Sequence, residues 1–333
     1  MKKQFSVLKS VVFGFLSWVS VAMASQDPVL TQAQGEVMIL SSPQSEAHEQ
    51  VSSGFIRSKF EGKFYLSKKA TVGDRLPIEG WLRTLPGARA RLIYPNGDQL
   101  NVGPASFFKL QSEQKNSNSA SMKLDYGMIR AIISKSGPRN QFKVRTPSAV
   151  MGVRGTDFVV EASGKNKQTS LTLIRGAVTL QPEGIKSTKE IKTGETAVAE
   201  VKKAPETFQT SKIELQRALV LTEKTEMRVA SEPIPEAVRK LEEQAKTTTV
   251  KDIVQYAKSP EEKAKLEKLA QQSADVASLN AAVVQMQVAK APVSSPGSQR
   301  ILEEIKSQTK RTDLQLKDLE KDPYQKYFEA TQE

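Results

Sequence analysis

Apolar and polar residues alternate with a period of two along much of the first two hundred residues. Phe142 and Val144 alternate with Lys143 and Arg145, and the segment Ala88–Tyr94 repeats the pattern. A period of two is typical of a strand with one buried and one solvent-facing side. We therefore expect a mainly β region whose strands have an apolar face and a polar or cationic face.

Turn residues divide this region at short, fairly even intervals, which leaves room for many short strands and no long helix. Asn96-Gly97 predicts a two-residue type I′ hairpin that joins Ala88–Tyr94 to Gln99–Val102. Such strand–turn–strand units predict a β-solenoid-like stack or an antiparallel sandwich. The turns lie at Gly73-Asp74, Pro86-Gly87, Asn96-Gly97, Gly103-Pro104, Gly127, Gly137-Pro138, Gly155, Gly164, Gly176, Gly184 and Gly194.

The region before Gly73 is less regular. Residues 35–40 predict a first strand, residues 41–53 a loop or linker, and residues 55–66 a further strand or hairpin. We expect residues 25–54 to form an N-terminal strand and linker, and the main β domain to begin at residue 55.

The pattern changes after Lys202–Pro205. Glycine is absent between Gly194 and Gly297, and strong helix formers take over. Pro260–Lys290 is the clearest predicted helix, because Ser259 can cap it and acidic residues fill its first turn. A final helix is expected at 299–319. The fold class predicted is thus mainly β, at 55–201, followed by an α-helical C-terminal region at 205–333.

Apolar residues of the predicted 260–290 helix recur at heptad-like spacing, with an interruption at Gln272. This spacing suits pairing with another helix, which would make the chain a homo-oligomer through its helical region. The interpretation that we favour is packing within one small helical domain, against 213–220, 238–241 or 301–305. The spaced residues are Leu269, Val276, Val283, Leu279 and Met286.

The first 24 residues have the pattern of an export signal. Three lysines precede an apolar run at 11–21, and Ala22-Met23-Ala24 forms a small-x-small cleavage site. We expect cleavage after Ala24; the alternative is an uncleaved inner-membrane anchor, since the run is only a little short of the roughly 20 residues that span a bilayer. The chain has no cysteine, hence no disulfide and no lipid-modified cysteine. These features predict the periplasm of a Gram-negative bacterium.

Positive charge is concentrated in the β-rich part. Residues 1–204 carry 29 Lys and Arg against 16 Asp and Glu, whereas residues 205–333 carry 20 against 21. A basic exported domain suits an envelope protein partner, an anionic cell-wall polymer or a lipid surface. The alternative is that solvent-facing cations only prevent edge-to-edge strand pairing. Nucleic acid is not an expected partner, because of the export signal.

Enzyme activity is not expected. The single histidine, His48, lies in a polar loop, and no phosphate-binding glycine motif, metal-ligand cluster or cofactor motif is present in the sequence. Paired carboxylates could still meet in space, but aspartates beside turn residues commonly close turns instead. The four aspartates concerned are Asp74, Asp98, Asp125 and Asp157.

The pattern T-P-x-A-x-x-x-x-R-G-T-x-F resembles the central signature of the FecR domain, named after the iron-dicitrate regulator of bacterial envelope signalling. Further motifs follow in that family's order, including Gly73–Leu76, Trp81–Thr84, Tyr94–Asp98 and Arg175–Val178, and the resemblance covers about 73–201. It favours the solenoid-like fold. Residues expected to be structural or to bind a partner are Thr146, Pro147, Ala149, Arg154, Gly155, Thr156, Phe158 and Gly176.

Arg154 is the residue of this signature with the best claim to a role beyond packing. We expect it to be a buried or half-buried pin for the bend, bound to backbone carbonyls or to Asp157 or Glu161; the alternative is a ligand contact.

The resemblance implies regulation and not catalysis. The family's namesake spans the inner membrane, receives a signal on its periplasmic side and controls a sigma factor on its cytoplasmic side. Only nine residues or so precede the apolar run here, so we expect no sigma-factor-binding domain. Two hypotheses stand: a signalling or sensory adaptor that binds a protein partner, and a structural envelope protein that binds anionic polymer or lipid.

Overall fold

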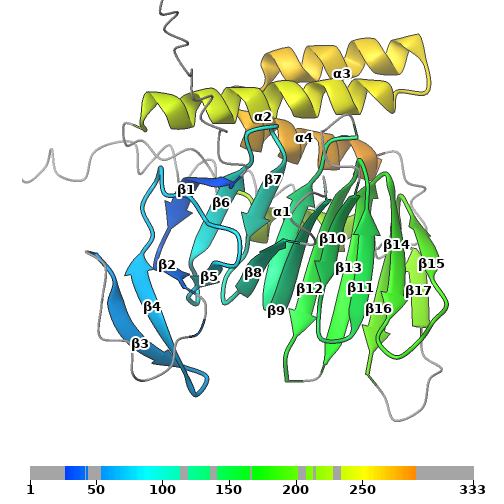
Figure 1. The fold of residues 1–333 in the computed structure, drawn as a ribbon. Coiled ribbons are helices and arrows are strands. Elements are labelled where there is room, and N and C mark those ends of the chain that lie inside the picture. The colour runs from blue at the N-terminus through cyan, green and yellow to red at the C-terminus, as the bar shows by residue number, and fades with distance from the viewer. Residues whose placement is uncertain are drawn as a thin grey trace, which may run out of the picture.

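The computed structural model describes residues 27–41, 43, 54–112, 119–135, 141–165, 167–201, 208–212, 215–227 and 234–289. It contains two stacked β-sheets with helices packed on one of them (Figure 1). The predicted fold class, mainly β followed by a helical region, is confirmed.

Both sheets are built almost entirely from antiparallel pairs; the parallel pair is β9–β10. Sheet A has the order β1 (Val29–Gln34), β6 (Arg89–Ile93), β7 (Gln99–Val102), β9 (Ser119–Ile132), β12 (Asp157–Ser163), β13 (Gln168–Arg175), β16 (Glu195–Glu200) and β17 (Phe208–Lys212). Sheet B has the order β3 (Ile56–Phe60), β4 (Lys63–Lys69), β2 (Val37–Leu40), β5 (Trp81–Thr84), β8 (Phe107–Ser112), β9, β10 (Gln141–Arg145), β11 (Ala149–Val153), β14 (Ala177–Pro182) and β15 (Lys189–Lys192).

The long strand β9 belongs to both sheets. Its first half pairs with β8 and β10 in sheet B, and its second half pairs with β7 and β12 in sheet A. The strand passes from one sheet to the other at Gly127, whose φ is +102°. Only glycine adopts such a φ without strain, so this residue permits the bend.

Five of the predicted turn glycines are corners at which the chain crosses between the sheets, and Gly35, which was expected to begin a strand, is a sixth. Each of the six has a positive φ, and the strands, or for Gly127 the two halves of β9, before and after it lie in different sheets. As the chain alternates between the sheets, most later strands are added at the same end of both sheets. This order makes the sandwich resemble a solenoid. The corner glycines are Gly35, Gly87, Gly127, Gly155, Gly176 and Gly194.

The apolar core lies between the two sheets, and alternate residues of each strand enter it. Phe158 and Val160 of β12 and Leu171 and Leu173 of β13 are all fully buried there. The alternation that predicted strands therefore also predicted which residues form the core.

The hairpin at Asn96-Gly97 is confirmed, but its predicted turn type is wrong. Gly97 has a φ of +89°, whereas Asn96 is not among the residues with positive φ that a type I′ turn requires at both centres. The amide of Gly97 donates to the carbonyl of Tyr94 at 2.8 Å. Pro95 explains this geometry, because its fixed negative φ suits the second position of a type I turn.

The helices are α1 (Leu215–Thr225), α2 (Glu236–Gln255), α3 (Pro260–Gln272) and α4 (Val276–Ala289). The predicted cap at Ser259 is confirmed, since its Oγ accepts the amide of Glu262 at 3.1 Å. The single helix predicted over 260–290 is wrong, because α3 ends at Gln272. Asp275 then begins α4 by accepting the amide of Ser278 at 2.7 Å.

Helices α1 and α4 lie on the outer face of sheet A. Leu221 and Val284 pack there against Met128, Val159 and Ile174. The heptad-spaced residues are used inside the chain: Leu269, Leu279, Val283 and Met286 join one cluster, and Val276 packs with Ile93 of β6. The helices thus pack on sheet A as well as on one another, and sheet A includes β17, which follows the predicted boundary at 201. The predicted division into domains stays a prediction.

No helix among the described ranges is long and apolar enough to cross a membrane. The predicted export signal, His48 and the predicted helix at 299–319 lie outside the described residues.

Candidate functional site

The first half of the signature closes the turn between β10 and β11. The Thr146 hydroxyl donates to the carbonyl of Ala149 at 3.1 Å and accepts its amide at 3.0 Å. It also lies 2.7 Å from the hydroxyl of Thr169. Ala149 and Phe158 are fully buried in the core. These contacts give the residues a structural role, and a partner-binding role for them stays a prediction.

The second half of the signature forms two stacked corners. A Cβ added at Gly176 would lie 2.6 Å from the carbonyl oxygen of Gly155, and one added at Gly155 would lie 2.5 Å from Cβ of Lys135. Both glycines also have positive φ. The pattern thus needs glycine at these two positions for close approach as well as for the bend.

Arg154 is exposed, so the expectation of a buried or half-buried pin is wrong. Asp157, one of the carboxylates considered as its partner, binds Arg130 instead. Arg154 lines a shallow depression of about 420 Å³ on the outer face of sheet B, beside Lys143 and Thr179. Gly155 and Thr156, not the arginine, fill the bend.

A cluster of buried charges joins the helices to sheet A; we call it the ion cluster, and it comprises Arg91, Arg130, Asp157, Glu226 and Glu242. Nε and Nη2 of Arg130 donate to the two carboxylate oxygens of Asp157 at 2.9 and 2.8 Å, and Nη1 donates to Glu226 at 2.8 Å. Arg91 donates to Glu226 at 2.8 Å and to Glu242 at 3.2 Å. Both guanidinium groups are fully buried.

Burial would by itself lower the pKa of Arg130, but the charges of Asp157 and Glu226 reverse this effect and raise it. Burial also raises the pKa of Glu226, and Arg130 and Arg91 offset this only in part. A cation held this firmly cannot lose its partners without a large penalty. The ion cluster therefore couples the segment after α1 to the face of sheet A.

The strand pattern does not reveal this cluster. Arg91 and Arg130 occupy polar positions of alternating strands, and such positions normally face water. Their partner Glu226 lies 135 and 96 residues away in the chain, so no local motif connects them. Asp157 was expected to close a turn, and that prediction is wrong because its carboxylate binds Arg130.

The other three aspartates each have a different set of partners. Asp74 accepts from Thr71 and Lys68, and although burial opposes the effect, these bonds lower the pKa of its carboxyl group. Asp98 accepts the amide of Ser134 at 2.8 Å, and Asp125 pairs with Lys123 at 2.7 Å. Asp74 thus closes its turn as predicted. The part of the chain that the structure describes contains no metal-binding group of three or more acidic, histidine or cysteine residues.

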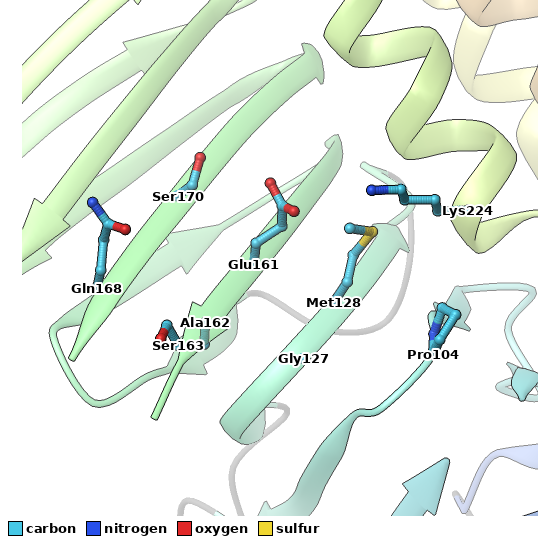
Figure 2. A pocket seen from close by; sticks show the side chains of 9 residues that line it. All are labelled: Pro104, Gly127, Met128, Glu161, Ala162, Ser163, Gln168, Ser170 and Lys224. Carbon is cyan, nitrogen blue, oxygen red and sulfur yellow. The ribbon is translucent and has the colours of Figure 1, made fainter. Parts of the chain in front are cut away.

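An open groove of about 500 Å³ lies on sheet A beside α1. Met128 and Glu161 are direct cross-strand partners at its centre, and Ser170 faces Glu161 from the next strand. Figure 2 shows Lys224 reaching from α1 over Met128 toward Glu161. The lining offers donors and acceptors to a polar segment of a ligand.

The outer face of sheet B carries a group of cations that we call the basic face: Lys109, Lys123, Lys143 and Arg145. Lys109, Lys123 and Arg145 are direct cross-strand neighbours on β8, β9 and β10. Lys109 and Lys123 lie 5.8 and 5.9 Å from the ring of Trp81, which stacks on Phe107 at 4.4 Å. The predicted cationic strand face is confirmed at these positions.

Residues 81–179 match the family model described as FecR protein. Two crystal structures of a candidate anti-sigma factor from Parabacteroides distasonis ATCC 8503 are similar, each at 14% identity with a TM-score of 0.36. The alignments cover 42% and 50% of this chain and 63% and 74% of those chains. Likeness at this level carries no argument about function. A comparison with curated proteins found no match.

Proposed function

Because residues 81–179 form an FecR domain, we propose that this chain is a non-enzymatic signalling adaptor of the cell envelope that binds a protein partner. The family match supports a regulatory role. The predicted export signal supports a periplasmic location. Self-association through the helices stays a prediction.

The basic face is the observation that carries the partner-binding part of the proposal. Directly opposed residues of neighbouring strands lie about 5 Å apart, so its cations form a dense row on a rigid sheet. Lys123 pairs with Asp125, and Lys109 pairs with Glu79, so part of the charge of the row is already compensated within the chain. An acidic partner surface would still gain orientation from the row.

The alternative function is that of a structural envelope protein. The same row of cations would then hold the protein to an anionic cell-wall polymer or to lipid headgroups. Binding to such a polyanion depends on charge alone and weakens steeply as salt shortens the screening distance to a few Å. A protein interface with an apolar centre keeps much of its affinity under the same conditions.

The test is recovery of partners from envelope extracts by residues 25–333, at about 0.05 and 0.5 M salt. We expect a discrete protein that is retained at 0.5 M salt and lost with Lys143→Glu plus Arg145→Glu. Lys265→Glu plus Lys268→Glu on exposed positions of α3 is the control, because it changes the charge equally. Recovery of polymer or lipid alone, lost at high salt, would support the alternative and refute the adaptor.

A further inference from the structure

Arg175 is a buried arginine at the end of β13. The residue is 3% exposed, and none of its three guanidinium nitrogens has a hydrogen-bond partner among the described residues. The hydroxyl of Thr156 is also buried and has no partner within the same described ranges. Thr156 lies at the same corner, since a Cβ at Gly176, the residue after Arg175, would meet its side chain at 2.6 Å.

The corner is completed by the end of α2 and by the segment that follows β9. Tyr256, directly after α2, donates its hydroxyl to the carbonyl of Gly155 at 2.8 Å. The guanidinium of Arg175 lies 5.1 Å from the centre of the Tyr256 ring, and Nζ of Lys135 lies 5.6 Å from it. Lys135 is exposed and Tyr256 half-buried, so the buried guanidinium of Arg175 lies just beneath the surface on this side.

Two carboxylates lie close to this corner. Asp157, which binds Arg130, is the direct cross-strand partner of Arg175. Asp252 of α2 is the carboxylate whose charge acts on Arg175 and Lys135. It accepts from the hydroxyl of Ser134 at 3.2 Å. Burial raises the pKa of Asp252 even though both cations oppose that rise. Arg175 and Lys135 therefore both act on Asp252, but no hydrogen bond joins the guanidinium of Arg175 to it among the described residues.

Unpaired donors on a buried guanidinium are costly, and native proteins seldom leave them without a partner. A guanidinium presents its donors as a planar fork that matches the oxygens of phosphate and carboxylate groups. We propose that the corner formed by Arg175, Lys135 and Thr156 is a binding site for a small oxyanion of the phosphate or sulfate class. Arg175 supplies the planar set of N–H donors, Lys135 supplies a second positive charge, and Thr156 supplies a hydroxyl donor.

This site would connect ligand binding to the position of the helices. Gly155, Thr156 and Arg175 come from the FecR domain, whereas Asp252 and Tyr256 come from the helical region. An anion bound between them holds α2 against the corner. The inference deepens the proposed sensory role, because it names the class of signal that the adaptor would detect.

The test compares thermal unfolding of the purified chain in about 10 mM phosphate or sulfate with unfolding in chloride at the same ionic strength. We expect either oxyanion to raise the midpoint by about 3 °C or more, as ligands of the native state do. Arg175→Gln should abolish the shift. Arg154→Gln should keep it, since Arg154 belongs to the same signature but is exposed.

Thr156→Val serves as a second variant in case Arg175→Gln fails to fold, because it removes one donor and keeps the shape. We expect it to weaken phosphate binding at least fivefold in titration calorimetry. No shift in the original chain, or an equal shift in Arg175→Gln, would mean an adventitious ion only and would overturn the site. Since no partner protein takes part, such a failure leaves the recovery experiment with the basic face unaffected.

Discussion

At the scale of single residues, glycine is required at some corners for space and at others for backbone conformation alone. Gly127 and Gly73 have nearly the same φ, +102° and +98°. A Cβ at Gly127 would lie 2.3 Å from Cα of Ser106, whereas nothing lies within 4 Å of one at Gly73. These two glycines therefore separate the two effects.

We expect Gly127→Ala to lower the free energy of unfolding by about 3 kcal/mol or more, because the backbone of β9 must move away from Ser106. Gly73→Ala should cost only about 1 kcal/mol, the penalty of a side chain at positive φ. Urea unfolding of both variants measures the difference. Equal losses would show that the close approach at Gly127 is not maintained in solution.

The positions of these turns were predictable from residue type, but the close approach was not. Glycine marks a bend in any sequence, and most of the predicted turns are found. Whether another segment fills the space beside a glycine depends on which strands pair, and paired strands can be far apart in the sequence. The close approach of Gly155 to Gly176 is an example.

At the scale of elements, the attachment of the helices to sheet A rests on polar contacts to an unusual degree. Glu226 accepts from Arg91, Arg130 and Asn101, and its side chain is 10% exposed. The apolar contacts beside it are few compared with the core between the sheets. Removal of one charge from such a cluster leaves buried arginine donors poorly paired.

We expect Glu226→Gln to lower the free energy of unfolding by about 2 kcal/mol, because both arginines lose a charged acceptor while the side chain keeps its shape. Glu223→Gln is the matched control, since Glu223 is exposed on α1, and it should change stability by less than about 0.5 kcal/mol. Denaturant unfolding followed by circular dichroism measures both. A loss for Glu226→Gln no larger than the control's would show that the ion cluster does not hold the helices.

Helix positions could be predicted more easily than helix contacts. The Ser259 cap and the heptad-spaced residues were visible in the sequence, and most of those residues pack together. The break after Gln272 was not predicted, although the heptad-like spacing is interrupted at that residue. The docking onto sheet A was not visible, because the residues that receive the helices, such as Arg91 and Asn101, look like solvent-facing positions of strands.

At the scale of the whole molecule, the outer face of sheet A lies between two parts that differ in stability: the β-sandwich and the helices. The sheets enclose a continuous apolar core to which both contribute. The helices meet sheet A through the ion cluster, a few apolar side chains and the contact of α2 with the hairpin at Gly97, where a Cβ would meet Thr248. Under the helices this face combines the buried charges with a few apolar residues, whereas the core between the sheets buries many more apolar side chains. We therefore expect the helices to leave sheet A at a smaller cost than the sheets can separate.

Native-state hydrogen exchange tests this difference in cohesion directly. We expect amides of α2, α3 and α4 to exchange through an opening whose free energy is several kcal/mol below that of global unfolding. Amides of β12 and β13 should exchange only through global unfolding, because their strands lie in the centre of sheet A and border the core. If phosphate occupies the corner of Arg175, it should slow exchange in α2 most, since Tyr256 and Asp252 belong to or follow that helix. Equal opening free energies for helices and sheets would instead make the chain one cooperative unit and would contradict this prediction.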